Sequence, residues 1–369
     1  MALGAVKLNN LNLRQGPLRE VENYFLYVGA GAGKNVGKLV AVNTETDLAA
    51  SLGAGPLAAT VAAARYNAGQ EWNACVLPLA PGQTWEAGVD FAIEHIGVEA
   101  VIITDPVETV ADLERQQQKA MQIMARDLLP MWFGSQTRGI KPTETWEEYV
   151  EALRPITKNI AAPNVLGPTP PLWGPELGTL AGRLANKSVT IADSPMRVLT
   201  GPLVGEWTTR PVDAAGRVLD RSILQTLDAA RFSVPQWYPG YDGTYWADGN
   251  VLDVEGGDYQ TIENLRVVQK AMRRVYPLAV ARIADRALNE TPASIAKAKQ
   301  YFTRPLREMA KSRQIRGWVF PGEIHPPTEQ SITITWHTKY SVELFIAVQP
   351  YNCPKQITCN ILLDLENYA

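Results

Sequence analysis

Short apolar segments alternate with helix-like segments over the first half of this chain, and this alternation restricts the fold more than any other feature. Strands are predicted at 24–28, 38–43, 72–77, 100–104, 128–133, 164–166 and 188–191. Helices are predicted between them, at 56–68, 84–95, 105–126, 143–159 and 175–185. Strands separated by helices are typical of βαβ units, which build a mainly parallel sheet covered on both faces. We therefore predict an α/β domain at residues 21–194, with a mainly parallel or mixed sheet and flanking helices.

The character of the sequence changes after this domain. Residues 195–257 are rich in Pro, Gly, Trp and Tyr, and they predict an irregular segment with one helix near 222–230. An apolar stripe then predicts a long helix from Asp258 to about Leu288, bent near Pro277. Thr291 followed by proline is a strong start signal for a second helix.

Two strands are predicted after these helices, at 331–338 and 342–348. In the first of them Ile332, Ile334 and Trp336 alternate with polar residues, which is the period of a half-buried strand. Residues 258–350 are therefore predicted to form a second domain, built from helices and strands.

Both ends of the chain are predicted to be extended arms, at residues 1–20 and 351–369. The first arm has no helical period, and its apolar residues include Val6, Leu8 and Leu11. The second arm predicts a strand from Gln356 to Leu365, in which one face carries Ile357, Cys359, Ile361, Leu363 and Leu365. An apolar strand face needs a sheet to cover it, either in its own domain or at a sheet edge of another subunit.

Composition argues against several classes of partner. The net charge is −3 and no basic block occurs, so we expect no nucleic-acid partner. Three cysteines (Cys75, Cys353, Cys359) and three histidines are too scattered to predict a metal site. The sequence shows neither a secretory signal nor an apolar stretch of the ~20 residues that a bilayer span needs, so we expect a cytosol-like setting without membrane insertion.

A glycine-rich turn after the first predicted strand lies where a phosphate-binding loop would lie. It runs Gly29-Ala30-Gly31-Ala32-Gly33-Lys34. The Walker pattern would need a glycine in place of Val28 and a hydroxyl residue in place of Asn35, and the dinucleotide pattern fails at Lys34. We interpret these glycines as a short turn that uses positive φ. The chain also lacks a Gly-x-Ser-x-Gly motif, so we predict no catalytic residue and no cofactor.

A line of basic residues marks the second long helix of the C-terminal domain. Lys297, Arg304 and Lys311 are spaced by seven residues, and Arg307 lies beside them. The line is either a solvated helix face or a docking stripe for an acidic partner, whose attraction would weaken with salt. A kink at Pro305 would spoil the alignment.

One stretch of this chain resembles a known family. Residues 238–250, followed by Asp258-Tyr259-Gln260 and the helix bearing 264–268, resemble the sheath proteins of contractile bacteriophage tails, in particular the shorter Mu-like sheath families. The resemblance also takes in residues 53–70, Trp72 and the strand-ended C-terminus. None of these segments carries a catalytic motif.

The resemblance implies a structural, non-enzymatic virion subunit, assembled in the host cytoplasm, that stacks as hexameric rings around a tail tube. It implies contraction without ATP hydrolysis, which drives the tube through the host envelope. The implied partners are other copies of the chain, the tail tube protein, and the baseplate and tail terminator proteins. On this interpretation both terminal arms add strands to neighbouring subunits, and the basic line faces the tube. Two alternatives stay open, a baseplate-type structural protein and an α/β nucleotide-binding enzyme that uses the glycine turn.

Overall fold

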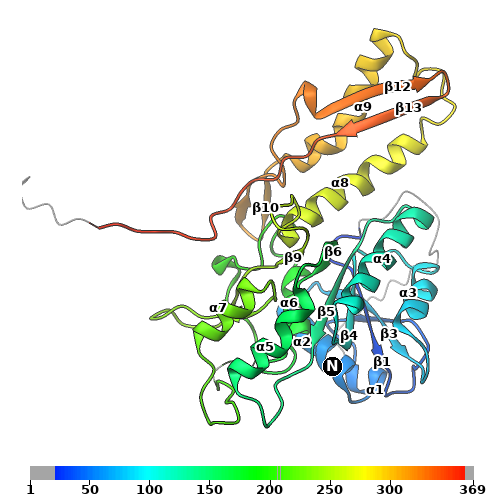
Figure 1. Ribbon diagram of the computed structural model, residues 1–369. Coiled ribbons are helices and arrows are strands. Elements are labelled where there is room, and N and C mark those ends of the chain that lie inside the picture. Colours follow the sequence, from blue (N-terminus) through cyan, green and yellow to red (C-terminus); the bar gives the residue numbers. More distant parts are fainter. Residues whose placement is uncertain (1–20, 206, 208, 362–369) are drawn as a thin grey trace, which may run out of the picture.

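A seven-stranded sheet forms the centre of the larger part of the molecule in this computed structural model, which describes residues 21–205, 207 and 209–361 (Figure 1). The strand order is β2-β3-β1-β4-β5-β6-β9. The strands are β1 (Phe25–Ala30), β2 (Val40–Asn43), β3 (Asn73–Leu79), β4 (Ala100–Val107), β5 (Trp132–Thr137), β6 (Ala162–Leu166) and β9 (Val251–Leu252). The five inner strands are parallel, and the short edge strands β2 and β9 are antiparallel to their neighbours. The predicted fold class is confirmed.

Helices cover both faces of this sheet, as the alternation of strands and helices predicts. They are α1 (Leu48–Leu52), α2 (Pro56–Ala68), α3 (Trp85–Ile93), α4 (Val110–Asp127), α5 (Trp146–Thr157) and α6 (Glu176–Leu184). Because side chains alternate along a strand, Phe25 and Tyr27 of β1 join the core under α2 and α6, while Leu26 and Val28 join the core under α3. We call this sheet, its helices and the segment 195–257 that packs on them the α/β body.

The Pro/Gly/aromatic segment at 195–257 is part of the α/β body. It contains η1 (Val198–Thr200), α7 (Arg221–Ala229), β7 (Pro235–Gln236) and β8 (Tyr245–Trp246), and its last strand, β9, pairs with β6 at the sheet edge. Trp246 is fully buried in the core under α2 and α6, and Leu219 and Leu224 are buried in the core that α5 lines. The segment is irregular because short turns, rather than long elements, carry its buried side chains.

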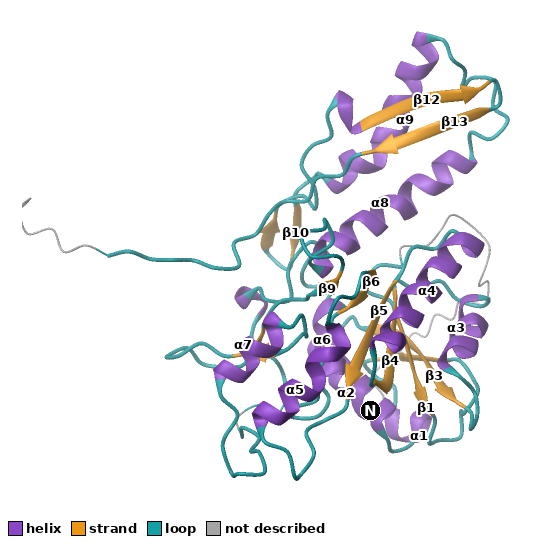
Figure 2. Cartoon of the chain, in the orientation of Figure 1, coloured by secondary structure: helices purple, strands orange, loops and turns teal. Residues whose placement is uncertain are grey.

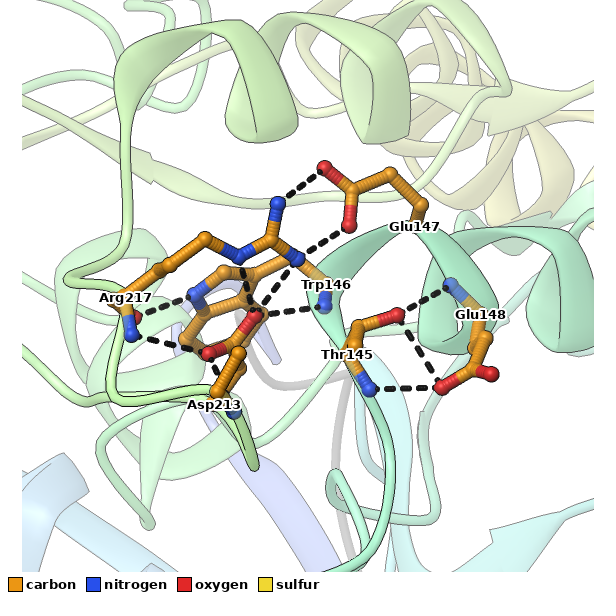
Figure 3. A network of polar contacts seen from close by, with 7 residues as sticks. Thr145, Trp146, Glu147, Glu148, Asp213 and Arg217 are labelled. Atoms are coloured by element: carbon orange, nitrogen blue, oxygen red, sulfur yellow. Dashed lines mark hydrogen bonds and ion pairs between the residues drawn. The ribbon is translucent and has the colours of Figure 1, made fainter.

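A polar network fixes one loop of this segment to the start of α5 (Figure 3). The Arg217 side chain bridges Asp213 and Glu147, and the Trp146 indole N–H donates to the Arg217 carbonyl at 2.9 Å. The Asp213 carboxylate also accepts the Trp146 backbone N–H at 3.3 Å. Beside it, Thr145 and Glu148 form a capping box that starts the helix. Two segments about seventy residues apart are therefore joined at one helix N-terminus.

The C-terminal domain extends from the α/β body along one helix (Figure 2). α8 (Ile262–Val280) leaves the body and packs against α9 (Pro292–Met309). The remaining elements are β10 (Arg313–Ile315), β11 (Trp318–Phe320), η2 (Glu329–Ser331), β12 (Ile332–Thr338) and β13 (Ser341–Ile346). β12 and β13 form an antiparallel hairpin whose inner face, with Ile332 and Ile334, is buried against Phe302 and Leu306 of α9.

Several elements differ from the sequence-based predictions. The strand predicted at 128–133 is β5 at Trp132–Thr137, because Leu128 is the left-handed C-cap of α4. Asp105 and Pro106 belong to β4, and α4 begins after Thr109, whose backbone N–H donates to Asp112 at 2.9 Å in a capping box. Residues 188–191 form turns rather than a strand, because the side chains of Asn186 and Asp193 accept their backbone N–H groups. α8 ends at Val280 instead of Leu288.

Candidate assembly site

The relation between the two parts of the molecule depends on α8, which carries basic side chains into buried contacts with the α/β body. Arg266 Nε lies 2.5 Å from Glu99 Oε1, and Arg266 also donates to the Asn23 side chain at 2.9 Å. Two turns further along, Arg273 pairs with Glu22 at 3.2 Å and donates to the Pro130 carbonyl at 3.1 Å. The base of α8 is therefore fixed to β1, β4 and β5 through the residues that precede each strand.

The electrostatics of these contacts follow from burial and from close opposite charges. Burial alone would raise the pKa of Glu99, but the charges of Arg266 and Arg273 and the hydrogen bond from Arg266 hold it below its ordinary value. Lys270, also on α8, lies 2.6 Å from Glu323, and burial lowers its pKa against the opposing effect of that carboxylate. Breaking a buried pair by removing one partner leaves an uncompensated charge, so the loss of one partner from Arg266–Glu99 or Arg273–Glu22 would destabilise the junction between α8 and the body.

The β12–β13 hairpin presents free strand edges at the far end of the C-terminal domain (Figure 1). Its inner face is covered by α9, and its outer face exposes Thr333, Thr335 and Phe345. Within the described residues the hairpin is a sheet of its own, so each strand has one neighbour and one unpaired side. Unpaired N–H and C=O groups along a strand are a template for another extended segment. The hairpin thus has the unpaired edges that strand addition requires.

The C-terminal arm leaves the body as an extended segment that projects away from the rest of the chain (Figure 1). The predicted strand from Gln356 is not formed over the described residues 356–361, because a strand needs a hydrogen-bonding neighbour and the single subunit supplies none there. Ile357 is 75% exposed and Ile361 95% exposed, and Cys359 is exposed as well. These three predicted donor residues remain uncovered within one subunit.

The other predicted strand-exchange residues lie outside the described part of the chain. This is so for Leu363 and Leu365 at the C-terminus, and for Val6, Leu8 and Leu11 in the N-terminal arm. The described chain begins at Val21, beside the α8 contacts of Glu22 and Asn23. The described chain therefore begins at the junction between the two domains, a position that the sequence pattern does not predict.

The four residues of the basic line are all exposed; three lie on α9, opposite the face that packs under the hairpin, and Lys311 follows the end of the helix. Lys297, Arg304, Arg307 and Lys311 point away from the buried Phe302 and Leu306. α9 continues through Pro305 to Met309, so the proline does not end the helix. Lys311 lies 2.8 Å from Glu308, whose pKa this contact lowers, and the line is therefore partly neutralised at its C-terminal end.

The glycine-rich turn after β1 lies where the strand order reverses, next to the carboxyl end of β4, which is the ligand position in doubly wound sheets. The chain's own atoms fill that space. A Cβ atom on Gly29 would lie 1.7 Å from Thr104 Oγ1, and one on Gly33 would lie 2.7 Å from the Leu52 carbonyl carbon. The expectation that these glycines supply positive φ is wrong, since that conformation occurs in this loop at Gly37. Close packing explains them instead.

Side chains that could carry other chemistry are dispersed. Within residues 21–361, apart from positions 206 and 208, no group of three or more His, Cys, Asp or Glu side chains could hold a metal ion. Among the helices of the same residues, none has the length and apolar character needed to cross a bilayer. Cys75 is buried beside Tyr24, and burial raises the pKa of its thiol to about 12, so this cysteine is a poor nucleophile.

Comparison with known proteins gives consistent matches along the whole chain. Residues 3–250 match the family model DUF2586, N-terminal domain, and residues 258–366 match DUF2586, C-terminal domain. A protein of Haemophilus phage HP1 (strain HP1c1), provisionally named as a tail sheath protein, is 43% identical over 372 residues, which cover 98% of each chain. The boundary between the two family models lies just before α8.

Two solved structures share the fold. A chain in the cryo-EM structure of the anti-feeding prophage baseplate in its contracted state matches with a TM-score of 0.62 and 15% identity, over 100% of both chains. The crystal structure of a sheath tail protein from Desulfitobacterium hafniense matches with a TM-score of 0.53 and 10% identity, over 94% of this chain and 96% of that one. At these identities the likeness concerns the fold.

Proposed function

This chain belongs to the DUF2586 family and to the phage tail sheath proteins, and from that premise we propose that its copies stack as hexameric rings around a tail tube and contract to drive the tube through the host envelope. The protein is a structural component of the virion rather than an enzyme. Its partners in this proposal are other copies of itself, the tail tube protein, and the baseplate and tail terminator proteins.

The observation that carries the proposal is the presence of a strand acceptor and a strand donor on one subunit. Among the described residues, the β12–β13 hairpin has unpaired edges, and Ile357 and Ile361 of the arm beyond Lys355 are exposed. We propose that the arm of one copy adds to the hairpin of a neighbour, together with the N-terminal arm that contains Val6, Leu8 and Leu11. Cys359, Leu363 and Leu365 then complete the apolar face of the donated strand.

The proposal assigns a role to each remaining part of the molecule. α9, with Lys297, Arg304, Arg307 and Lys311, faces the tube and meets an acidic surface there. The α/β body lies outside, where neighbouring copies change contacts when the sheath contracts. Because buried ion pairs fix α8 to the body, each subunit moves as a rigid unit while the arms remain connected. Contraction is then a switch between two packings of the same subunits.

Electron microscopy of the purified full chain, beside a variant that lacks residues 356–369, tests this proposal. We expect long striated tubes from the full chain and a folded, non-polymerising subunit from the truncated one. Tubes formed by the truncated variant would contradict strand donation by the C-terminal arm. A full chain that stays monomeric in every condition, with and without tube protein, would contradict the sheath assembly, and closed rings without tubes would indicate a baseplate-type component.

A further inference from the structure

The first part of the C-terminal arm is docked on the subunit, and the docking ends at one residue. After β13, the His325 backbone N–H donates to the Gln349 carbonyl at 2.8 Å, and Pro350 bridges to Ile324. The rings of His325 and Tyr351 then stack with centroids 3.8 Å apart. We call residues 349–355 the arm root. Residues 351–354 of the root are also exposed, and Lys355 is the last described residue of the arm that is partly buried, since every residue from 356 to 361 is exposed.

Lys355 is held by carboxylates from two other segments of the chain. Its Nζ lies 2.6 Å from both carboxylate oxygens of Asp248 and 2.8 Å from Glu263 Oε1. Asp248 precedes β9 in the α/β body, and Glu263 lies in the first turn of α8. The Lys355 side chain is 27% exposed, whereas those of Asp248 and Glu263 are 15% and 7% exposed. One ammonium group therefore connects the arm, the body and α8 in a largely buried site.

Lys355 supplies the positive charge that balances the carboxylates of this site. A third carboxylate, Asp228, hydrogen-bonds to Asn250 nearby, and its pKa is raised by burial and by the charge of Asp248. Burial and Asp248 also raise the pKa of Glu263, against the lowering effect of Lys355. Glu263 Oε2 is buried and has no protein hydrogen-bond partner. Without Lys355, the site would contain only acidic groups that repel one another.

We propose that Lys355 is a latch that fixes the point from which the C-terminal arm leaves the subunit, so that residues from Gln356 onward are the part offered to a second copy. This proposal rests on strand donation as the proposed function. The acceptor hairpin of the second copy is then reached from a fixed point beside Asp248 and Glu263. Fixing the root also reduces the chain entropy that strand addition has to overcome.

The cysteines of this chain allow the latch to be measured in the unassembled subunit. Cys353 lies inside the arm root and Cys359 lies beyond it, both are exposed, and Cys75 is buried. A nitroxide attached at Cys353 in a Cys359→Ser background reports on the root, and one attached at Cys359 in a Cys353→Ser background reports on the free arm. In the parent we expect the label at Cys353 to rotate several-fold more slowly than the label at Cys359.

Lys355→Met removes the ammonium group and keeps the side-chain stem, and Lys158→Met is the matched control on an exposed lysine. In Lys355→Met we expect the label at Cys353 to become as mobile as the label at Cys359. We also expect chymotrypsin to cleave after Tyr351 about ten times faster, which corresponds to a free energy of opening of the arm root that is lower by ~1.4 kcal/mol. We expect the Asp248→Asn/Glu263→Gln double variant to do the same. The control should change neither measurement.

The latch would be overturned if the two labels were equally mobile in the parent. It would also be overturned if Lys355→Met left the mobility of the Cys353 label and the cleavage after Tyr351 unchanged. If Lys355→Met released the arm root and still formed tubes normally, the role of the latch in assembly would be overturned. These results are distinct from failure of strand donation itself, which appears as tubes formed by the variant that lacks residues 356–369, whatever the labels report.

Discussion

Arg266 on α8 and Glu99, the residue immediately before β4, form an ion pair with an Nε–Oε1 distance of 2.5 Å, and both side chains are almost completely buried. The two residues are 167 positions apart in the sequence. Their contact joins the C-terminal domain to the sheet of the α/β body. A buried charged contact therefore connects the two parts of the subunit, beside the apolar contacts of α8.

Replacing one member of this pair should destabilise the protein strongly. We expect Glu99→Gln or Arg266→Met to lower the free energy of unfolding by about 3–5 kcal/mol, because either change leaves a buried charge without its partner. Denaturant unfolding measures the effect. The control is Glu86→Gln, which breaks a more exposed pair with Arg115 and should cost at most about 1 kcal/mol. Similar losses of unfolding free energy in Glu86→Gln and in the variants of the Arg266–Glu99 pair would show that burial does not determine the strength of the ion pair.

The stability of the α/β body should decrease between about pH 4.5 and pH 7 through Glu176. Burial raises the pKa of this carboxyl from 4.5 to about 7, against the lowering effect of backbone N–H groups that include those of Trp173 and Gly174. The folded state therefore retains a proton that the unfolded state loses in this range, and stability decreases as pH rises through it, by roughly 3 kcal/mol if the carboxyl acts alone.

Unfolding experiments from pH 5 to pH 8 measure this dependence. Glu176→Gln cannot titrate at this position, so its stability should vary less with pH than that of the parent. Glu99 acts in the opposite sense, because its pKa is lowered in the folded state, and its contribution is lost only as pH falls through that lowered value. An identical pH profile in the parent and in Glu176→Gln would contradict the assignment.

Aspartate on the apolar face of the C-terminal arm should block assembly without unfolding the subunit. Ile357 and Ile361 are exposed in the single subunit, so Ile357→Asp/Ile361→Asp should change the unfolding free energy by no more than about 0.5 kcal/mol. In a donated strand both side chains would face the acceptor's covered side, where a charge is costly. The control is Thr358→Asp/Asn360→Asp on the opposite face. Tube yields in electron microscopy should differ between the two pairs, and equal yields would contradict a one-faced strand.

Charge reversal along the basic line should impair assembly on the tail tube. Lys297→Glu/Arg304→Glu/Lys311→Glu changes exposed residues on α9 and just after it, so the subunit should fold normally while losing its attraction to an acidic tube surface. Co-sedimentation with purified tube protein at low and high salt measures this, and binding by the parent should weaken with salt. Lys34→Glu/Lys38→Glu/Lys158→Glu gives the same change in net charge on other exposed positions. Unchanged binding by the α9 variant would contradict a tube contact through this line.

Local signals in the sequence were sufficient for elements with clear boundaries. Pro56 at the first helical position and Gly69 after the last predict the limits of α2, and the structure has the same helix, Pro56–Ala68. The alternation of Ile332 and Ile334 with threonines likewise predicts the buried face of β12. In both cases the information lies within a few residues, where helix caps and side-chain periodicity act.

Features that depend on contacts between residues far apart in the sequence could not be predicted from local patterns. β9 has two residues, Val251 and Leu252, and it is a strand only because β6 lies beside it. The ion pair of Arg266 with Glu99 and the contacts of Lys355 join segments that no local pattern connects. The strand predicted at the C-terminus has the right alternation, but its hydrogen bonds need a neighbour that one subunit does not contain.

The two edge strands of the main sheet are short and antiparallel to their neighbours, which limits where another chain can add to the subunit. β2 has four residues and β9 has two, so neither offers a long template on which a stray chain could grow. The β12–β13 hairpin, whose strands have seven and six residues, offers more. Under the proposed strand exchange, each copy then has its acceptor positions at one place, which favours ordered growth over amorphous aggregation. Short edge strands on the main sheet would then limit pairing elsewhere before the tail is assembled.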